Sequence, residues 1–302
     1  MNKIYQIIKD KPKKITIKNS VEIINTSNNT YVIKKKTNKN LDYIYDYLTS
    51  RSFDYFPKRL IKDNEYDIYE YVEGVKIPNE QKILDLVNLL TLLHNKTTFY
   101  KEIDIDIYKN IYEDVIGRIE YLNNYYNNLM DTIESTIYMS PSEYLIARNI
   151  SLIYNSLNYS RYQIDRWYNL IKDKRKIRLV NIHNNLNIDH FIKKDKPYFI
   201  SWDKSKIDMP IYDILNLYKN HYLDFEFMDI LKFYESKYPL LPEERLLLFV
   251  LMALPDEIDM TKTEYNTCIK VRKLLDYLAK TEYLTTEYSK ETKTNEPNKF
   301  KE

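Results

Sequence analysis

The first part of the chain alternates apolar and polar positions in the manner of β-strands. Short alternating runs recur before residue 75, and polar or turn-forming residues bound each of them. Ser27-Asn28-Asn29 joins two runs and predicts a hairpin turn, because asparagine tolerates a positive φ. One short helix is expected here, with Leu41, Ile44, Tyr45 and Leu48 on one face. The expected strands are residues 14–18, 21–26, 30–35, 59–62 and 66–72.

From Pro78 onward the apolar residues recur at helical spacing. Ser142 is expected to cap a long helix that ends near Ile171. Further helices are expected from Pro210 to about Glu287. The expected buried positions of the first three helices are Ile83, Leu86, Val87, Leu90 and Leu93, then Ile107, Ile111, Val115, Ile119 and Leu122, then Leu145, Ile146, Ile150 and Ile153.

Between the long helices the pattern returns briefly to strands. Strands are expected at 177–182, 190–192 and 198–202, with a turn at 194–197 between the last two. The pattern therefore predicts an α+β, bilobal fold. Its parts are a β-rich N-lobe at 1–74 that ends at Gly74, a helical C-lobe at 75–288 with a strand-loop-strand insert at 177–203, and a disordered polar tail at 289–302.

Composition narrows the function classes. The 46 Lys and Arg residues nearly balance the 44 Asp and Glu residues, so no nucleic-acid partner is expected. One cysteine, Cys268, excludes an internal disulfide and a multi-cysteine metal site, and indicates a reducing compartment. No signal peptide is expected at the N-terminus. The longest apolar run, Leu246–Leu254, is too short for the ~20 residues of a membrane span and predicts a buried helix. The expected location is the cytoplasm, or a structure assembled from the cytoplasm.

Glycine and tyrosine contents are both unusual. Only Gly74 and Gly117 are present, so no glycine-rich phosphate loop can form. The 31 tyrosines, with abundant Asn, Ile and Lys, suggest the AT-rich genome of a low-GC bacterium. Codon bias and a functional tyrosine-rich surface are both open explanations.

Five short motifs occur in a fixed order. They are Tyr31-Val-Ile-Lys34, Ile68-Tyr-Glu-Tyr-Val-Glu-Gly74, His183-Asn-Asn-Leu-Asn-Ile-Asp-His190, Phe199-Ile-Ser-Trp-Asp203 and Met209-Pro-Ile-Tyr-Asp-Ile214. With the order of the expected elements, they resemble the aminoglycoside phosphotransferase and choline kinase-like superfamily. Within it, they are most similar to the spore coat CotS-type branch.

The resemblance covers roughly residues 12–285 and implies a kinase-like fold with an ATP and magnesium site. Lys34 falls at the family's phosphate-binding lysine. The backbone of Glu70, Tyr71 and Val72 falls at the strand that contacts the adenine. These four residues are the nucleotide-binding candidates.

The resemblance also shows which catalytic groups differ. Asn185 falls on the catalytic aspartate, His190 on the metal-binding asparagine, and Ser201 on the main magnesium-binding aspartate. Phosphoryl transfer uses a carboxylate at the acceptor hydroxyl and carboxylate oxygen on Mg²⁺. The family's glutamate partner for the lysine has no clear match, since Asp42 and Asp46 are the only acids in that helix.

The groups that brace the fold in the family are retained. His183, Leu186 and Asp213 match their family counterparts, and Asn184 falls on a glycine. His94 matches a histidine at the end of a helix, for which a structural role is expected. Retained bracing and altered catalytic positions are the pattern of a pseudokinase.

Four interpretations remain open at this point. The favoured one is a binding or scaffold protein, associated with a spore coat or with an active enzyme. An active ATP-dependent phosphotransferase for a small hydroxyl substrate would need relocated acids, with Asp203 replacing Ser201 at the metal and Asp189 as a second carboxylate. A different metal site would use His183, His190 and Asp203. An accidental resemblance in an unrelated helical protein is the fourth.

Overall fold

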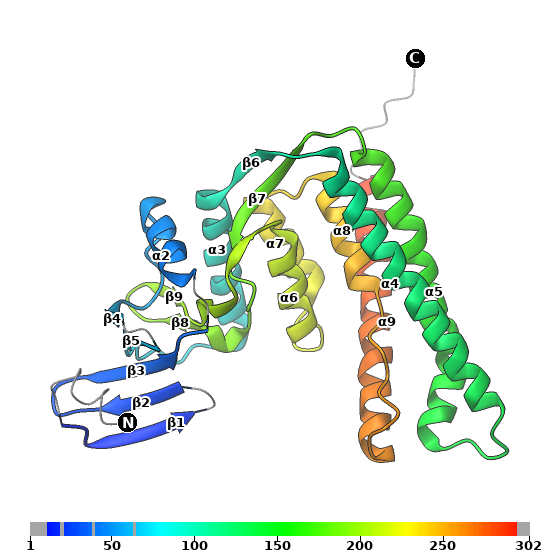
Figure 1. The fold of residues 1–302 in the computed structure, drawn as a ribbon, viewed down its shortest axis with the longest axis horizontal. Coiled ribbons are helices and arrows are strands. Elements are labelled where there is room, and N and C mark those ends of the chain that lie inside the picture. The colour runs from blue at the N-terminus through cyan, green and yellow to red at the C-terminus, as the bar shows by residue number, and fades with distance from the viewer. Residues whose placement is uncertain (1–10, 19–20, 38–39, 63–64, 295–302) are drawn as a thin grey trace. The chain divides into compact units, whose positions relative to one another are not determined.

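The computed structural model describes residues 11–18, 21–37, 40–62 and 65–294 (Figure 1). The chain divides into two compact units. The first unit contains the residues up to Thr98 and Val180–Asn216, and the second contains Phe99–Leu179 and the residues from Leu217 onward. The first unit therefore combines the predicted N-lobe with most of the strand-loop-strand insert, whereas the predicted lobe boundary lies at Gly74.

An antiparallel five-stranded sheet, in the order β1-β2-β3-β5-β4, forms the first unit's N-terminal part (Figure 1). The predicted strands and the hairpin after β2 are confirmed, and Thr26 closes that turn through hydrogen bonds with Asn29. The last strand ends at Glu70, before the predicted Val72. The strands are β1 Lys14–Lys18, β2 Val21–Asn25, β3 Thr30–Lys35, β4 Arg59–Lys62 and β5 Tyr66–Glu70.

Alternation along the strands separates two faces of this sheet. Ile24, Ile33 and Ile68 form a buried cluster on one face. Helix α2, Leu41–Ser50, buries the four apolar residues predicted for its inner face. Val32 and Lys34 lie on β3 between the inward residues, so they belong to the opposite face.

The rest of the first unit contains the loop of the His183–His190 motif. Helix α3, Asn79–Thr97, is followed in this unit by the end of β7, Lys176–Ile182, which pairs with β10, Lys206–Asp208. A hairpin of β8, Phe191–Lys193, and β9, Pro197–Phe199, lies between them. The remaining elements are the 3₁₀ turns η1, Ile188–His190, and η2, Trp202–Lys204, and the first part of α6, Ile211–His221.

The predicted strand through Trp202 is wrong beyond Phe199. Ser201 has a left-handed backbone with φ of 67°, which ends the extended conformation, and a 3₁₀ turn begins at Trp202. His190 likewise lies in η1 rather than in the predicted strand, which begins at Phe191. The sequence pattern missed β10, because it pairs with the distant β7 and no tight turn marks a hairpin there.

Gly74 is required by close packing rather than by its backbone conformation. A Cβ atom on Gly74 would lie 2.8 Å from Ile192 Cγ2 and 3.4 Å from the Lys193 carbonyl oxygen. The next residue, Val75, donates its N–H to that carbonyl oxygen at 2.7 Å. The segment after β5 is therefore held directly against β8.

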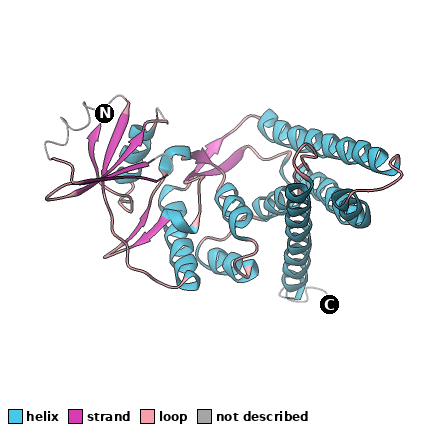
Figure 2. Cartoon of the chain, turned by 90° about the horizontal axis from the view of Figure 1, so that it is seen from below, coloured by secondary structure: helices cyan, strands magenta, loops and turns pink. Residues whose placement is uncertain are grey.

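The second unit is mainly helical (Figure 2). Helix α5 packs against α4, α8 and α9. A short strand, β6 Phe99–Glu102, which the sequence pattern missed, pairs with the first part of β7. The helices are α4 Ile105–Glu134, α5 Pro141–Ile171, α7 Phe227–Lys237, α8 Pro242–Ala253 and α9 Glu264–Thr294.

The start of α5 corrects the predicted cap. Ser140 is the N-cap and forms a capping box with Glu143, and Pro141 occupies the first turn. Ser142, the predicted cap, is buried and donates its N–H and hydroxyl to Glu264. A proline at the first helical position is the signal that identifies Ser140, because its missing N–H needs no partner.

The predicted buried helix is confirmed, whereas the predicted tail begins later than expected. Helix α8 buries most of the apolar run that the sequence predicts as a buried helix. Within the described residues, no helix is long and apolar enough to cross a membrane. Helix α9 continues to Thr294, so the tail predicted from Ser289 begins as helix, and residues 295–302 lie outside the described residues.

Candidate functional site

Asp213, in the first turn of α6, is the buried anchor of the loop. Its Oδ2 accepts hydrogen bonds from the His183 N–H at 2.8 Å and from His94 Nε2 at 3.1 Å. Its Oδ1 accepts the Asn184 N–H at 2.6 Å. Both Asp213 and His94 are fully buried. The structural roles that the sequence predicts for these two residues agree with these contacts.

The loop turns sharply at Asn184, which has a φ of 56°. This is the residue that falls on the family's glycine. Asparagine is one of the few side chains that enter the left-handed region readily. Its amide also donates to the Lys204 carbonyl oxygen at 3.1 Å. The loop therefore keeps a left-handed turn without a glycine.

His183 is completely buried beneath the loop. Its Nε2 donates to the Ile200 carbonyl oxygen at 2.9 Å, and its ring lies 4.8 Å from the Trp202 ring in an edge-on contact. Burial lowers the pKa of His183 to about 4, against a smaller opposing effect of Asp213. His183 is therefore neutral at pH 7 and serves as a packing and orienting group.

Lys34 of β3 joins the two halves of the first unit. Its Nζ donates to Ser201 Oγ at 3.1 Å and to Asp203 Oδ2 at 3.0 Å. Both charged side chains are partly buried, with 19% and 30% of their surfaces exposed. The structure thus brings three predicted site residues together although more than 160 positions separate Lys34 from the others. The lysine ammonium is the cation between Ser201 and Asp203.

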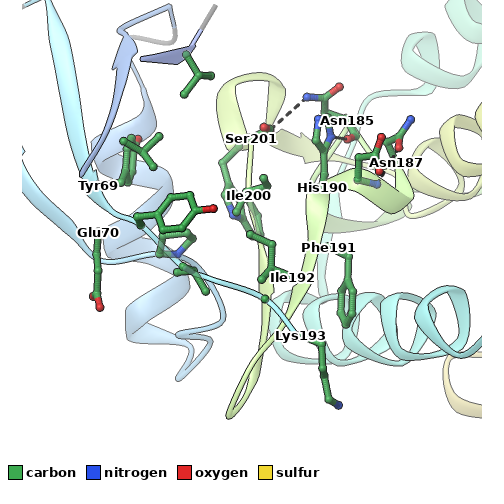
Figure 3. Close-up of a pocket in the computed structure, with 18 of the residues that line it drawn as sticks. Tyr69, Glu70, Asn185, Asn187, His190, Phe191, Ile192, Lys193, Ile200 and Ser201 are labelled. Atoms are coloured by element: carbon green, nitrogen blue, oxygen red, sulfur yellow. Dashed lines mark hydrogen bonds between the residues drawn. The ribbon is translucent and has the colours of Figure 1, made fainter. Parts of the chain in front are cut away.

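Asn185 and His190 complete the polar end of the site (Figure 3). The Asn185 amide nitrogen donates to the Ser201 carbonyl oxygen at 3.3 Å. His190 Nδ1 donates to the Asn185 carbonyl oxygen at 2.6 Å, because a carbonyl can only accept. Asn187 lies beside them, and its side chain accepts the Asp189 N–H at 2.9 Å. Asp189 itself is exposed at the pocket's edge.

These groups line one end of a cavity of about 960 Å³ within the first unit. Its walls are apolar on both sides, which suits a flat ring. The sheet supplies one wall and the β8–β9 hairpin supplies the other. The apolar wall residues are Val21, Ile23, Val32 and Tyr69 from the sheet, and Phe191, Ile192 and Ile200 from the hairpin.

None of these wall residues is among the binding candidates that the sequence predicts. Strand alternation would have identified Val21, Ile23 and Val32, since all lie on the Lys34 face of the paired strands. Val21 pairs directly with Lys34, and Ile23 pairs with Val32. The hairpin wall carried no comparable signal.

Of the three predicted adenine-contacting residues, one has a backbone N–H that is available to a ligand. The Glu70 and Tyr71 N–H groups donate to the carbonyl oxygens of Lys58 and Thr30. Among the described residues, the Val72 N–H has no hydrogen-bond acceptor. Glu70, Tyr71 and Val72 all line the cavity. Of these candidates, Val72 is the one whose N–H is able to bind a ring nitrogen.

Of the two acids in α2, Asp46 is exposed and Asp42 is engaged elsewhere. Asp42 pairs with Lys36 at 3.2 Å and with Arg59, so it is not the partner of Lys34. Arg59 also lies 3.4 Å from Asp67, whose pKa is nevertheless raised because burial outweighs that attraction. The Lys34 partner is Asp203 instead.

The side chains do not fit a magnesium ion. Mg²⁺ prefers carboxylate oxygens in octahedral geometry at about 2.0–2.1 Å. Ser201 is a neutral hydroxyl, His190 offers nitrogen, and the Asp203 carboxylate holds the Lys34 ammonium. Among the described residues, no group of three or more His, Cys, Asp or Glu side chains could hold a metal. The predicted metal site of His183, His190 and Asp203 is therefore not formed, and His183 Nε2 is hydrogen-bonded to a backbone carbonyl oxygen.

Comparison with known proteins places this geometry on a known fold. The chain is similar to an aminoglycoside phosphotransferase from Alicyclobacillus acidocaldarius, with a TM-score of 0.67 and 7% identity over 94% of this chain and 93% of that one. It is similar to the AMP-bound spectinomycin phosphotransferase APH(9)-Ia, with a TM-score of 0.56 and 12% identity over 98% and 95%. It is also similar to the choline kinase LicA from Streptococcus pneumoniae, with a TM-score of 0.50 and 16% identity over 97% of both chains.

The chain has a kinase-like fold. Its class is α+β, with a small antiparallel sheet in the N-terminal lobe and a helical C-terminal lobe, as predicted. No protein-family model matches the sequence, and no curated protein matches it significantly. At these identities the likeness establishes the fold alone.

Proposed function

We propose that this chain is a catalytically impaired kinase-fold protein that binds a nucleotide without transferring its phosphate. The observation that carries the proposal is the contact of Lys34 with Ser201 and Asp203. The group expected to bind phosphate also supplies the positive charge where the kinase reaction uses a metal. Apolar walls and the Val72 N–H support ring binding in the same cavity.

The second support is the chemistry of Asn185. A carboxamide orients a hydroxyl but cannot accept its proton, and general acid–base catalysis supplies about 10²–10⁴ of rate. The Asn185 nitrogen is, in addition, directed at the Ser201 carbonyl oxygen. Without both the proton acceptor and the metal ligands, ordinary turnover is expected to be lost.

An active phosphotransferase is the second candidate, and the position of Asp203 favours it. The Asp203 carboxylate lines the cavity beside Ser201, so it would reach a metal if Lys34 turned away. Asp189 lines the same cavity and would be a second carboxylate. Such an enzyme would use ATP and act on a small hydroxyl substrate.

Turnover assays separate the two candidates. The purified protein is mixed with MgATP and a panel of amino-sugars and amino-alcohols, and ADP release is measured. We expect no turnover above the buffer rate. Magnesium-dependent turnover that Asp203→Ala abolishes, while the exposed Asp195→Ala control retains it, would establish the active candidate.

A scaffold role, with protein partners in a spore coat or an enzyme complex, is a further part of this proposal. Its support is the resemblance of the motifs to the spore coat CotS-type branch. The measurement is immunodetection of the chain in coat extracts of purified spores and in the soluble fraction of sporulating cells. Its presence in the soluble fraction only would contradict a coat role.

A further inference from the structure

The Lys34 ammonium fills the position of a cation in this site. It contacts Ser201 Oγ and Asp203 Oδ2 at 3.1 and 3.0 Å. The resemblance aligns Ser201 with the main magnesium-binding residue of the family. A divalent ion bound to the same two oxygens would repel the ammonium at close range. The site therefore carries its own cation.

The charge of the cavity limits what it binds. The lining contains four lysines and three acidic residues, and Lys193 is paired with Asp85 outside the lining at 3.1 Å, so little positive excess is available. A phosphate monoester carries about −1.5 to −2 charges at pH 7, and a triphosphate carries more. Without a divalent ion, the extra phosphates would be poorly compensated. The charged lining residues are Lys34, Lys76, Lys82, Lys193, Glu70, Asp189 and Asp203.

Neutral donors near Lys34 suit a single phosphate. Ser201 presents a hydroxyl, and the Asn187 amide nitrogen lies at the same end of the cavity (Figure 3). The Asn187 oxygen is already bound to the Asp189 N–H, which leaves the amide nitrogen as a donor. An ammonium with neutral donors is a common environment for phosphate oxygens.

We propose that the cavity binds a nucleoside monophosphate without a divalent metal ion, with the Lys34 ammonium taking the metal's place. This inference rests on the proposed nucleotide-binding function and specifies its ligand class. The apolar walls hold the base, and the Lys34 end holds the phosphate. MgATP, the usual ligand of a kinase site, is disfavoured because the magnesium ligands are missing.

Titration calorimetry with adenosine, AMP, ADP and ATP tests the proposal, each in EDTA and in excess Mg²⁺. We expect AMP to bind about tenfold more tightly than ATP in EDTA, and its Kd to change less than about threefold with Mg²⁺. ATP affinity that rises more than about tenfold with Mg²⁺ would overturn this inference. If Mg²⁺ tightens ATP binding in this way but the turnover assay shows no ADP release, the proposed function still stands. Failure of every nucleotide to bind would overturn both.

Lys34→Met tests the role of the ammonium. The variant is expected to weaken AMP binding by about tenfold or more while adenosine binding stays within about threefold. Lys35→Met is the matched control, because Lys35 is the next residue on β3, is exposed and lies outside the cavity lining. Equal losses for adenosine and AMP would contradict a phosphate contact by Lys34.

Ser201→Asp tests the position of the cation. Aspartate tolerates the left-handed backbone at this residue and supplies the carboxylate that a magnesium site needs. We expect Mg²⁺ to tighten ATP binding to this variant by about tenfold and to leave the parent unchanged. If Mg²⁺ does not change the ATP affinity of Ser201→Asp, the placement of the cation at Ser201 is contradicted.

Discussion

Replacing Asp213 with asparagine should destabilise the first unit severely, although the side chain keeps its size. Asp213 accepts three hydrogen bonds, two of them from consecutive backbone N–H groups at His183 and Asn184. An asparagine presents one oxygen and one NH₂ group to the same three donors. In its better orientation, the oxygen serves His183 and His94. The NH₂ group then faces the Asn184 N–H.

The magnitude follows from these contacts. A buried donor left without an acceptor costs about 1–3 kcal/mol, and hydrogen bonds to a neutral acceptor are weaker than those to a charged one by about 1 kcal/mol each. Part of this loss is offset because a neutral amide is easier to bury than a carboxylate. The net cost of Asp213→Asn is therefore about 2–4 kcal/mol. This is a large fraction of the roughly 5–15 kcal/mol of typical protein stability.

Tryptophan fluorescence allows the first unit to be followed by itself. The chain has two tryptophans, Trp202 in the first unit and Trp167 in the second, and both are buried. A Trp167→Phe background leaves Trp202 as the reporter of the first unit. Urea unfolding in this background gives the free energy of unfolding of that unit with and without Asp213→Asn.

The control is Asp195→Asn in the β8–β9 turn, because Asp195 is exposed and belongs to the same unit. Its expected effect is below about 0.5 kcal/mol. An unfolding free energy for Asp213→Asn that matches this control would refute the role of Asp213 as the loop's anchor.

Two further predictions concern pH and packing. Burial lowers the pKa of His183 to about 4, so on acidification His183 is protonated in the unfolded chain before it is protonated in the folded one. The free energy of unfolding is therefore kept above about pH 6.5 and falls by about 3 kcal/mol towards pH 4. Urea unfolding at several pH values should show this loss of unfolding free energy in the parent but not in His183→Gln. An equal dependence of the unfolding free energy on pH in the two proteins would contradict this prediction. Gly74→Ala should cost about 1–3 kcal/mol, because its Cβ meets Ile192 Cγ2 at 2.8 Å. Gly117→Ala in α4, where a Cβ meets nothing within 4 Å, should stabilise the chain by about 0.5–1 kcal/mol. If the melting temperatures of Gly74→Ala and Gly117→Ala shift in the same direction, this reasoning is refuted.

Local patterns predicted most of the secondary structure. Alternation identified the five strands of the sheet, and the 3.6-residue period identified α2 and its four buried residues. Burial of one face of an element leaves such a periodic trace. β6 and β10 were missed because each pairs with the distant β7, without the tight turn that identified the equally short β8 and β9.

The end of β9 shows why local pattern fails at the site. All of residues 198–202 except Ser201 are aromatic or β-branched, which favours a strand. Ser201 is nevertheless left-handed, and its hydroxyl accepts from Lys34 while its carbonyl oxygen accepts from Asn185. Nothing in the local sequence encodes either contact. Asp203 lies beside Ser201 because the 3₁₀ turn begins directly after Ser201.

The sequence by itself determined which chemical groups are present. The resemblance aligns Asn185, His190 and Ser201 with the proton acceptor and metal ligands of a kinase, and no change of conformation turns them into carboxylates. Only the tertiary structure decided what these groups contact. Lys34 reaches Ser201 and Asp203 across more than 160 residues, because pairing of the strands and folding of the loop bring distant segments together. The identity of an ionisable group is local, whereas its partner and its solvation depend on the whole fold.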